Sequence, residues 1–203
     1  MKIGILGGTF NPIHLGHLLI AENAYEQFNL DYVNIMPAYV SPFKLDSNVL
    51  DKEHRKAIIK LSIKDNPHFK LDTREIDSEQ ISYTYITLSE MKKKNPEDEL
   101  YFILGADSLK TIKKWRNPQI IFDNATILAA VRDNDDMDDL KRYADEINEL
   151  FNGKVGFIKT PTYDVSSTDI RERFKNCKSV KYMMADDAIK YINDNNLYRE
   201  QRS

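Results

Sequence analysis

The chain has 203 residues, a formal net charge of −3, a hydrophobic content of 41% and a charged content of 30%. This length predicts one domain with a substantial core, and the composition is ordinary for a globular protein. The slightly acidic balance argues against a nucleic-acid partner, which would need a basic face, but it permits a nucleotide enzyme with a local positive pocket.

The cysteine content and the hydropathy pattern bear on the cellular compartment. Cys177 is the only cysteine, so no intrachain disulfide is available, and a reducing cytosol is the simplest setting. The N-terminus does not resemble a signal peptide, and no apolar run approaches the roughly 20 residues that span a bilayer. We therefore expect a cytoplasmic protein without a membrane partner.

Short apolar runs alternate with helical patterns along the chain. In chain order the pattern predicts a strand over 2–6, a helix over 16–28, a strand over 32–36, a helix over 52–64, a strand over 69–71, a helix over 83–94, a strand over 100–104, a helix over 108–114, a strand over 126–131, a helix over 136–151, a strand over 155–158, and helices over 167–174 and 185–195.

This alternation is typical of βαβ units. We expect an α/β fold, a Rossmann-like three-layer sandwich with a mainly parallel central sheet. One domain over residues 1–203 should include a small helical C-terminal subregion over 166–203. Ligands on such sheets bind beyond the carboxyl ends of the strands, which is where the strongest motifs lie.

The most informative segment, residues 7–17, follows the first strand and reads Gly-Gly-Thr-Phe-Asn-Pro-Ile-His-Leu-Gly-His. A glycine turn between a strand and a helix brings backbone amides close to a ligand, and a helix start favours negative charge. His14 and His17 point the same way if both lie in the first helical turn. The segment therefore suits an anion that gains charge during reaction, such as a phosphate under attack.

A second anion site is predicted over residues 165–171, which read Val-Ser-Ser-Thr-Asp-Ile-Arg. We expect Ser167 to be the N-cap of a helix, with Thr168 in its first turn and Arg171 on the same face as Ser167. Amides, hydroxyls and a guanidinium group would then converge on one anion.

A third motif follows the strand predicted over 100–104. Gly105 would let the backbone approach a ligand closely, and Asp107 can accept hydrogen bonds from ribose hydroxyls or amino groups. Trp115, the only tryptophan, offers a flat face to a planar ring, with core packing as the alternative.

Other nucleotide and metal signatures are missing. The sequence contains neither a GxxxxGK[ST] phosphate loop nor a GxGxxG dinucleotide motif. The pair His14 and His17 falls short of the three or four ligands that a zinc site needs.

These motifs resemble the HxGH nucleotidyltransferase superfamily, here through His14, Leu15, Gly16 and His17. The whole segment 7–17 resembles one branch, the bacterial nicotinate mononucleotide adenylyltransferases. The resemblance implies a nucleotidyltransferase fold and transfer of the adenylyl group of ATP to nicotinate mononucleotide. The products would be nicotinate adenine dinucleotide and pyrophosphate, in NAD biosynthesis.

The resemblance also implies roles for individual residues. It makes His14, His17 and Arg171 catalytic. The residues that it assigns to ATP are Gly7, Gly8, Thr9, Phe10, His14, His17, Gly105, Asp107, Ser166, Ser167, Thr168 and Arg171. Those that it assigns to nicotinate mononucleotide are Asn11, Lys44, Ser82, Tyr83, Thr84 and Trp115. Mg²⁺ would be held by the ATP phosphates and not by protein side chains.

The chain departs from the family pattern at a few positions. Val165 replaces the usual isoleucine, and Phe43 replaces a histidine, so that only Lys44 of that loop is carried over as a phosphate contact. The usual aspartate after the Ser-Tyr-Thr segment is also missing.

Two alternatives remain beside this interpretation. Phosphopantetheine adenylyltransferases and cytidylyltransferases share parts of the first motif but carry other diagnostic segments. A nucleotide-binding sensor without turnover would keep the glycine loops and lose the phosphate-activating side chains, which are all present here. The preference for nicotinate over nicotinamide mononucleotide stays open, as does the choice between a monomer and a homo-oligomer.

Overall fold

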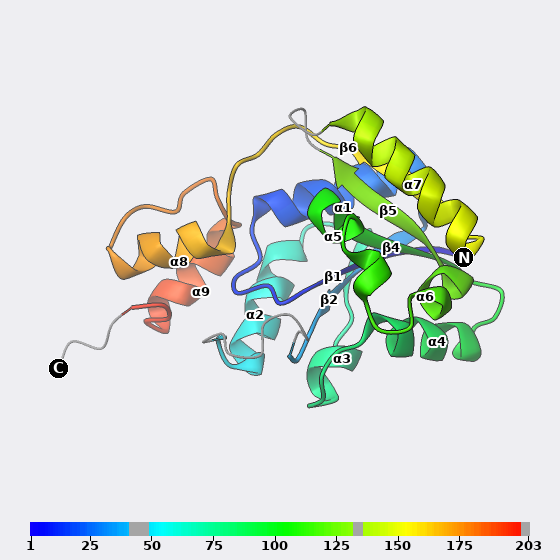
Figure 1. Ribbon diagram of the computed structural model, residues 1–203. Coiled ribbons are helices and arrows are strands. Elements are labelled where there is room, and N and C mark those ends of the chain that lie inside the picture. The colour runs from blue at the N-terminus through cyan, green and yellow to red at the C-terminus, as the bar shows by residue number, and fades with distance from the viewer. Residues whose placement is uncertain (41–48, 132–135, 200–203) are drawn as a thin grey trace.

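The computed structural model describes residues 1–40, 49–131 and 136–199, and it is built on a six-stranded sheet (Figure 1). The strands are β1 (Lys2–Gly8), β2 (Tyr32–Pro37), β3 (Phe69–Leu71), β4 (Glu99–Gly105), β5 (Ala125–Val131) and β6 (Val155–Lys159). They lie side by side in the order β3-β2-β1-β4-β5-β6, and every neighbouring pair is parallel. The predicted α/β architecture is confirmed.

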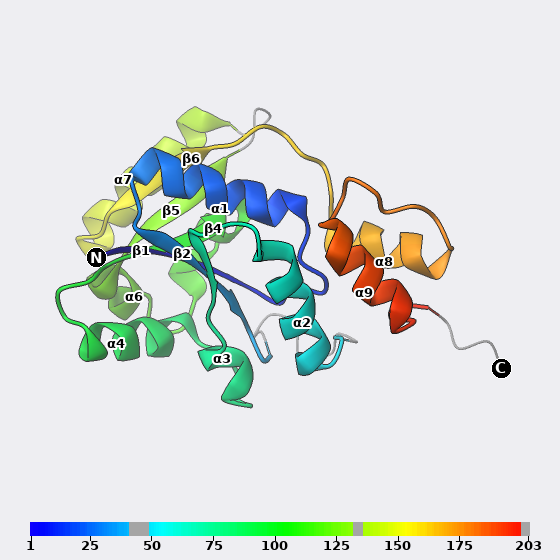
Figure 2. The same ribbon diagram turned by 180° about the vertical axis from the view of Figure 1, so that it is seen from behind.

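Helices cover both faces of the sheet, as Figure 2 shows from behind. They are α1 (Leu15–Phe28), α2 (Lys52–Ile63), α3 (Arg74–Asp77), α4 (Thr84–Lys94), α5 (Ala106–Leu109), the 3₁₀ helix η1 (Ile112–Lys114), α6 (Pro118–Asn124), α7 (Met137–Phe151), α8 (Ser167–Lys175) and α9 (Asp186–Asp194). Among the residues described, no helix combines the length and the apolar character needed to cross a membrane.

Each face of the sheet carries its own apolar cluster, because side chains alternate between faces along a strand. Ile3 and Ile5 of β1 pack in the cluster that includes apolar residues of α4, α5, α6 and α7. Leu6 packs on the opposite face, in the cluster that includes residues of α1, α2, α8 and α9. The two C-terminal helices therefore share a core with α1 and α2.

Several predicted boundaries need correction. The single helix predicted over 108–114 is wrong, since α5 ends at Leu109 and the chain continues as η1. There the amides of Lys114 and Trp115 bond to carbonyls three residues back, which is the tighter 3₁₀ pattern. The short helices α3 and α6 were not predicted, although Pro118 at the start of α6 is a recognised helix-start signal.

A buried guanidinium group joins the loops at the carboxyl edge of the sheet. Arg55 of α2 is only 2% exposed. Its Nη1 donates to the carbonyls of Thr9 at 2.8 Å and Ala38 at 2.7 Å, and its Nε donates to that of Leu50 at 3.1 Å. Its Nη2 donates to the carbonyl of Tyr39 at 3.2 Å. Burial lowers the pKa of this guanidinium, yet arginine stays charged at any ordinary pH.

We predict that Arg55→Met lowers the free energy of unfolding by about 2–4 kcal/mol, because it leaves four buried or partly buried carbonyls without this donor. Urea unfolding at pH 7 would measure the difference. The control is Arg142→Met, because the Arg142 side chain is 78% exposed; its effect should stay within about 0.5 kcal/mol. Equal stability of the two variants would contradict the anchoring role of Arg55.

Candidate active site

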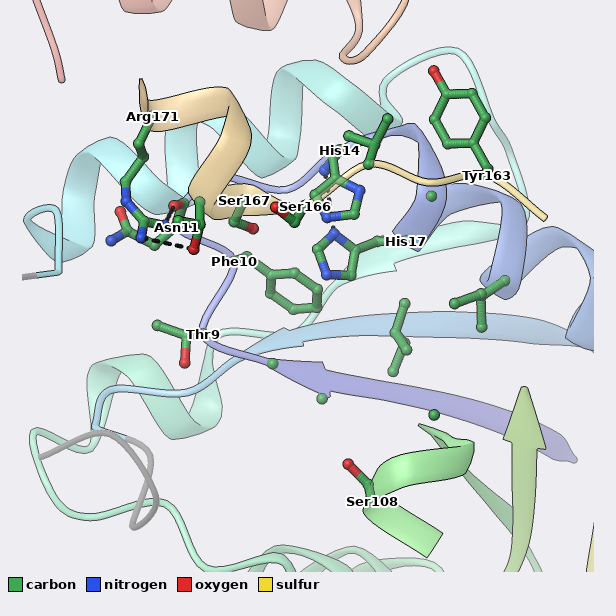
Figure 3. Close-up of a pocket in the computed structure, with 18 of the residues that line it drawn as sticks. Thr9, Phe10, Asn11, His14, His17, Ser108, Tyr163, Ser166, Ser167 and Arg171 are labelled. Atoms are coloured by element: carbon green, nitrogen blue, oxygen red, sulfur yellow. Dashed lines mark hydrogen bonds between the residues drawn. The ribbon is translucent and has the colours of Figure 1, made fainter. Parts of the chain in front are cut away.

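A cavity of about 1020 Å³ lies beyond the carboxyl ends of β1 and β4, between the sheet and α8 (Figure 3). β1 and β4 are adjacent and parallel. β2 and β3 extend the sheet on one side of β1, and β4, β5 and β6 extend it on the other, so the strand order reverses between β1 and β4. Ligands of open α/β sheets bind at such a point, because the loops there diverge to opposite faces. The position matches the expectation from the sequence.

The loop after β1 differs in one respect from the predicted glycine turn. β1 runs through Gly8, and the left-handed residue of the loop is Phe10, with φ of 47°. A Cβ on Gly8 would lie 3.1 Å from the Phe10 ring. The glycine therefore lets Phe10, which is 3% exposed, fold back beneath the loop.

The histidine pair has the geometry that its spacing predicts. α1 begins at Leu15, so His14 is its N-cap and His17 its third residue, and their ring centroids are 3.7 Å apart. Nδ1 of His17 accepts the backbone N–H of His14 at 3.3 Å. In the neutral ring the proton of His17 then sits on Nε2, which makes that atom the donor.

One aromatic contact and one glycine help to place these rings. The Phe10 ring meets His17 edge-on, with centroids 5.1 Å apart. A Cβ on Gly16 would approach Nδ1 of His14 to 3.1 Å, so the glycine between the histidines lets the His14 ring lie against the backbone. The pair is thus pre-positioned at the start of α1, where the helix dipole favours an anion.

The helix that carries the second anion motif, α8, begins at Ser167, where the predicted range 167–174 also begins. Ser166 is the N-cap, and its Oγ accepts the backbone N–H of Asp169 at 3.0 Å. The assignment of Ser167 as N-cap is therefore wrong. Either serine satisfies the capping preference, and the tertiary contact of Ser167 decides between them.

That contact ties α8 to the loop after β1. Ser167 Oγ donates to the carbonyl of Pro12 at 2.8 Å, and Arg171 Nη1 donates to that of Asn11 at 2.8 Å. Arg171 Nη2 also donates to Thr168 Oγ1 at 3.1 Å. Figure 3 shows Arg171 beside Asn11 and Ser167, on the same side of the cavity as the histidines. The two predicted anion motifs are therefore one site.

The described lining of this cavity is positively charged. It includes Arg171, Lys175 and Arg199, against one carboxylate, Glu172. Lys175 and Arg199 were not predicted. Lys175 follows Arg171 by four residues and so shares its helix face, a signal that was available in the sequence. No local pattern places Arg199 here.

A second cavity of about 670 Å³ adjoins the first. Both cavities are lined by Gly7, Gly8, Thr9, Phe102, Ser108 and Trp115. The second is also lined by Ser82, Tyr83 and Thr84, and α4 begins at Thr84 without a side-chain cap. Asp107 lies in the second cavity, whereas Gly105 lines the first.

Trp115 lies at the junction of the two cavities. Its Nε1 donates to Thr111 Oγ1 at 3.4 Å, and its ring meets Phe102 edge-on with centroids 6.2 Å apart. The indole is thus packed on one side and lines the cavities on another, and its stacking on a planar ligand stays a prediction.

Glu75 of α3 is a half-buried acid at the second cavity that sequence reasoning missed. The hydroxyl of Thr87 donates to its Oε1 at 2.6 Å. Burial raises the pKa of this carboxyl, while hydrogen bonds from Thr87 and Ser82 oppose the shift. In the sequence it is one acid among several charged residues, so nothing marks it as partly buried at a cavity.

Every predicted site residue that the structure describes lines one of the two cavities. The predicted contact Lys44, and Phe43 beside it, lie outside the described residues. Within residues 1–40, 49–131 and 136–199, no three His, Cys, Asp or Glu side chains are grouped closely enough to hold a metal ion.

Comparisons with known proteins agree on one family. Residues 5–173 match the model of the cytidylyltransferase-like family. The chain is 42% identical to the probable nicotinate-nucleotide adenylyltransferase of Lachnoclostridium phytofermentans, over 97% of this chain and 98% of that protein. It is 37% identical to the nicotinate-nucleotide adenylyltransferase of Bacillus subtilis, again over 97% and 98% of the two chains.

A solved structure supports the fold. The Plasmodium falciparum nicotinic acid mononucleotide adenylyltransferase complexed with APC superimposes with a TM-score of 0.78 over 97% of this chain and 96% of that chain. The identity is 20%, so this likeness concerns the fold alone.

We predict a pH effect from Glu75. Because its folded pKa lies above the unfolded value of 4.5, the native state binds the proton more tightly, and stability falls as pH rises from 4.5 through the folded pKa. Glu75→Gln should remove this decline and keep the acceptor oxygen for Thr87. Each unit of pKa elevation corresponds to about 1.4 kcal/mol.

Urea unfolding at pH 5 and pH 8 would compare Glu75→Gln with Glu90→Gln, an exposed position on α4. The expected result is a smaller loss of stability between the two pH values in Glu75→Gln only. The same pH dependence in both variants would show that the Glu75 proton does not differ between the folded and unfolded states.

Proposed function

The chain belongs to the nicotinate-nucleotide adenylyltransferases within the cytidylyltransferase-like family, and from this premise we propose how its site works. The enzyme transfers the adenylyl group of ATP to nicotinate mononucleotide, which gives nicotinate adenine dinucleotide and pyrophosphate in NAD biosynthesis. The observation that carries the assignment at the level of the site is the continuity of a basic cavity, holding His14, His17 and Arg171, with a second cavity lined by Trp115 and the start of α4.

The reaction needs no general base, because the attacking group is already an anion. An oxygen of the acceptor's 5′-phosphate forms a bond to the α-phosphorus of ATP, and the bond from that phosphorus to the pyrophosphate oxygen breaks. Catalysis then depends on holding the two groups in line and on stabilising the charge that develops. Both tasks suit donors fixed by the fold.

The donors divide between the two anion motifs. His17, with its proton on Nε2, and His14 donate to phosphate oxygens at the reacting centre. Arg171, Ser167 and Thr168 hold the leaving phosphates at the start of α8. Because Arg171 is fixed on the Asn11 carbonyl, its guanidinium needs little reorganisation when ATP binds.

The second cavity receives the acceptor. The pyridine ring stacks on Trp115, and its carboxylate lies at the uncapped start of α4, near the Thr84 hydroxyl and the backbone of Tyr83. This arrangement brings the 5′-phosphate toward the glycine-rich end of β1, which lines both cavities.

Mg²⁺ would enter the site bound to ATP. Glu172 is the one carboxylate in the described lining of the larger cavity, so we propose that phosphate oxygens and water would be the ligands of the ion. When bound, Mg²⁺ neutralises charge on the triphosphate.

Pyrophosphate release with Mg-ATP tests the function directly. Nicotinate mononucleotide, nicotinamide mononucleotide, phosphopantetheine and FMN would be compared as acceptors, each with and without excess EDTA. We expect turnover with the first acceptor and its loss with EDTA. A preference for phosphopantetheine or FMN would overturn the assigned acceptor, and ATP binding without turnover on any acceptor would favour a sensor.

We predict that His17→Ala lowers kcat by about 10²–10³-fold, the usual cost of removing a fixed donor to a developing oxyanion. Steady-state pyrophosphate release would measure it, and thermal unfolding would confirm the fold. The control is His68→Ala, because His68 stacks on Tyr25 and lines neither cavity. Turnover of His17→Ala close to that of the wild type would exclude the catalytic role.

A further inference from the structure

Tyr198, five residues before the end of the 203-residue chain, lines the larger cavity and has no part in the mechanism above. Its hydroxyl donates to Oδ1 of Asn11 at 2.9 Å. The backbone N–H of Leu50 donates to the same oxygen at 3.2 Å. The Asn11 side chain is therefore engaged by two protein groups, although the family resemblance assigns Asn11 to the acceptor.

The backbone of Asn11 is hydrogen-bonded to Arg171. Its carbonyl accepts Nη1 of Arg171 at 2.8 Å. A shift of Asn11 would therefore move the carbonyl oxygen to which the Arg171 guanidinium is hydrogen-bonded. The chain of contacts runs from the Tyr198 hydroxyl through Asn11 to the guanidinium that holds the leaving phosphates.

The placement of Tyr198 is specified by the fold. Asn196 and Tyr198 adopt left-handed conformations, with φ of 51° and 62°, and so turn the chain back after α9. The Leu197 amide bonds to the carbonyl of Ile192, which closes that turn. The Tyr198 ring then stacks on Phe174 of α8, with centroids 6.0 Å apart.

The hydroxyl is kept in its donor form. Burial raises the pKa of Tyr198 above its usual range, although the positive charges of Arg171 and Arg55 act in the opposite direction. A phenol that stays protonated can keep its hydrogen bond to Asn11 at any pH at which the enzyme would work.

From this geometry we infer that Tyr198 is a positioning residue for ATP, which acts by fixing Asn11 and through it the guanidinium of Arg171. The inference rests on the proposed role of Arg171 as a ligand of the ATP phosphates. It extends the site to the C-terminal segment, which contributes a fixed contact and not only a helical cover.

The test compares Tyr198→Phe with Tyr191→Phe in the full-length protein. Tyr191 is a matched control, because its hydroxyl also makes one hydrogen bond, to Nδ1 of His54 at 2.9 Å, and it lines neither cavity. We expect Tyr198→Phe to raise the Kd for Mg-ATP about three- to tenfold, the range of one lost hydrogen bond. Tyr191→Phe should change the Kd for Mg-ATP less than about twofold. Tyr198→Phe should likewise change the KM for nicotinate mononucleotide less than about twofold.

A double-mutant cycle with Arg171→Ala distinguishes an effect of Tyr198 on the position of Arg171 from an effect on the stability of the whole protein. If Tyr198 acts through Arg171, Tyr198→Phe should have no further effect on the Kd for ATP in the Arg171→Ala background. An equal effect in both backgrounds, or an unchanged Kd in the single variant, would overturn the inference. Failure of the wild-type protein to bind ATP would instead overturn the proposed function.

Discussion

The arrangement of the site depends on one buried cation, the guanidinium group of Arg55. An uncompensated charge in a protein interior is costly, so the group persists only because backbone carbonyls surround it. Those carbonyls belong to segments that follow β1 and β2, at Thr9, Ala38 and Tyr39, and to Leu50 just before α2. The same interaction that satisfies Arg55 therefore fixes the loops from which both cavities are built.

On this base α8 completes the larger cavity. Ser167 and Arg171 reach back across 155 and 160 residues of sequence to carbonyls of the loop after β1. Because the histidines belong to the helix that follows that loop, one short segment sets the distance between the two groups of donors. Tyr198 adds a third constraint on the same loop, from the far end of the chain.

The division into two cavities matches a reaction with two substrates. The larger cavity is basic and lies at helix starts, which suits a polyphosphate. The smaller one offers an aromatic face, an uncapped helix start and a half-buried acid, Glu75, which accepts a hydrogen bond from Thr87 and so links α3 to α4. Gly7 and Gly8 of β1 line both cavities, so the proposed transfer would bring the two substrates to the same stretch of backbone.

The sequence by itself determined the strands of a parallel sheet, most of the helices and the motifs that line the cavities, because their signals are local: apolar periodicity, a histidine pair one helical turn apart and a serine-rich helix start. Only the tertiary structure decided which serine caps α8, that residues 108–114 do not form one helix, and that Arg55, Glu75, Arg199 and Tyr198 belong to the site. These features depend on partners far away in the chain. A local pattern cannot distinguish a buried charge or phenol from a solvated one, because the groups that satisfy it meet only when the chain folds.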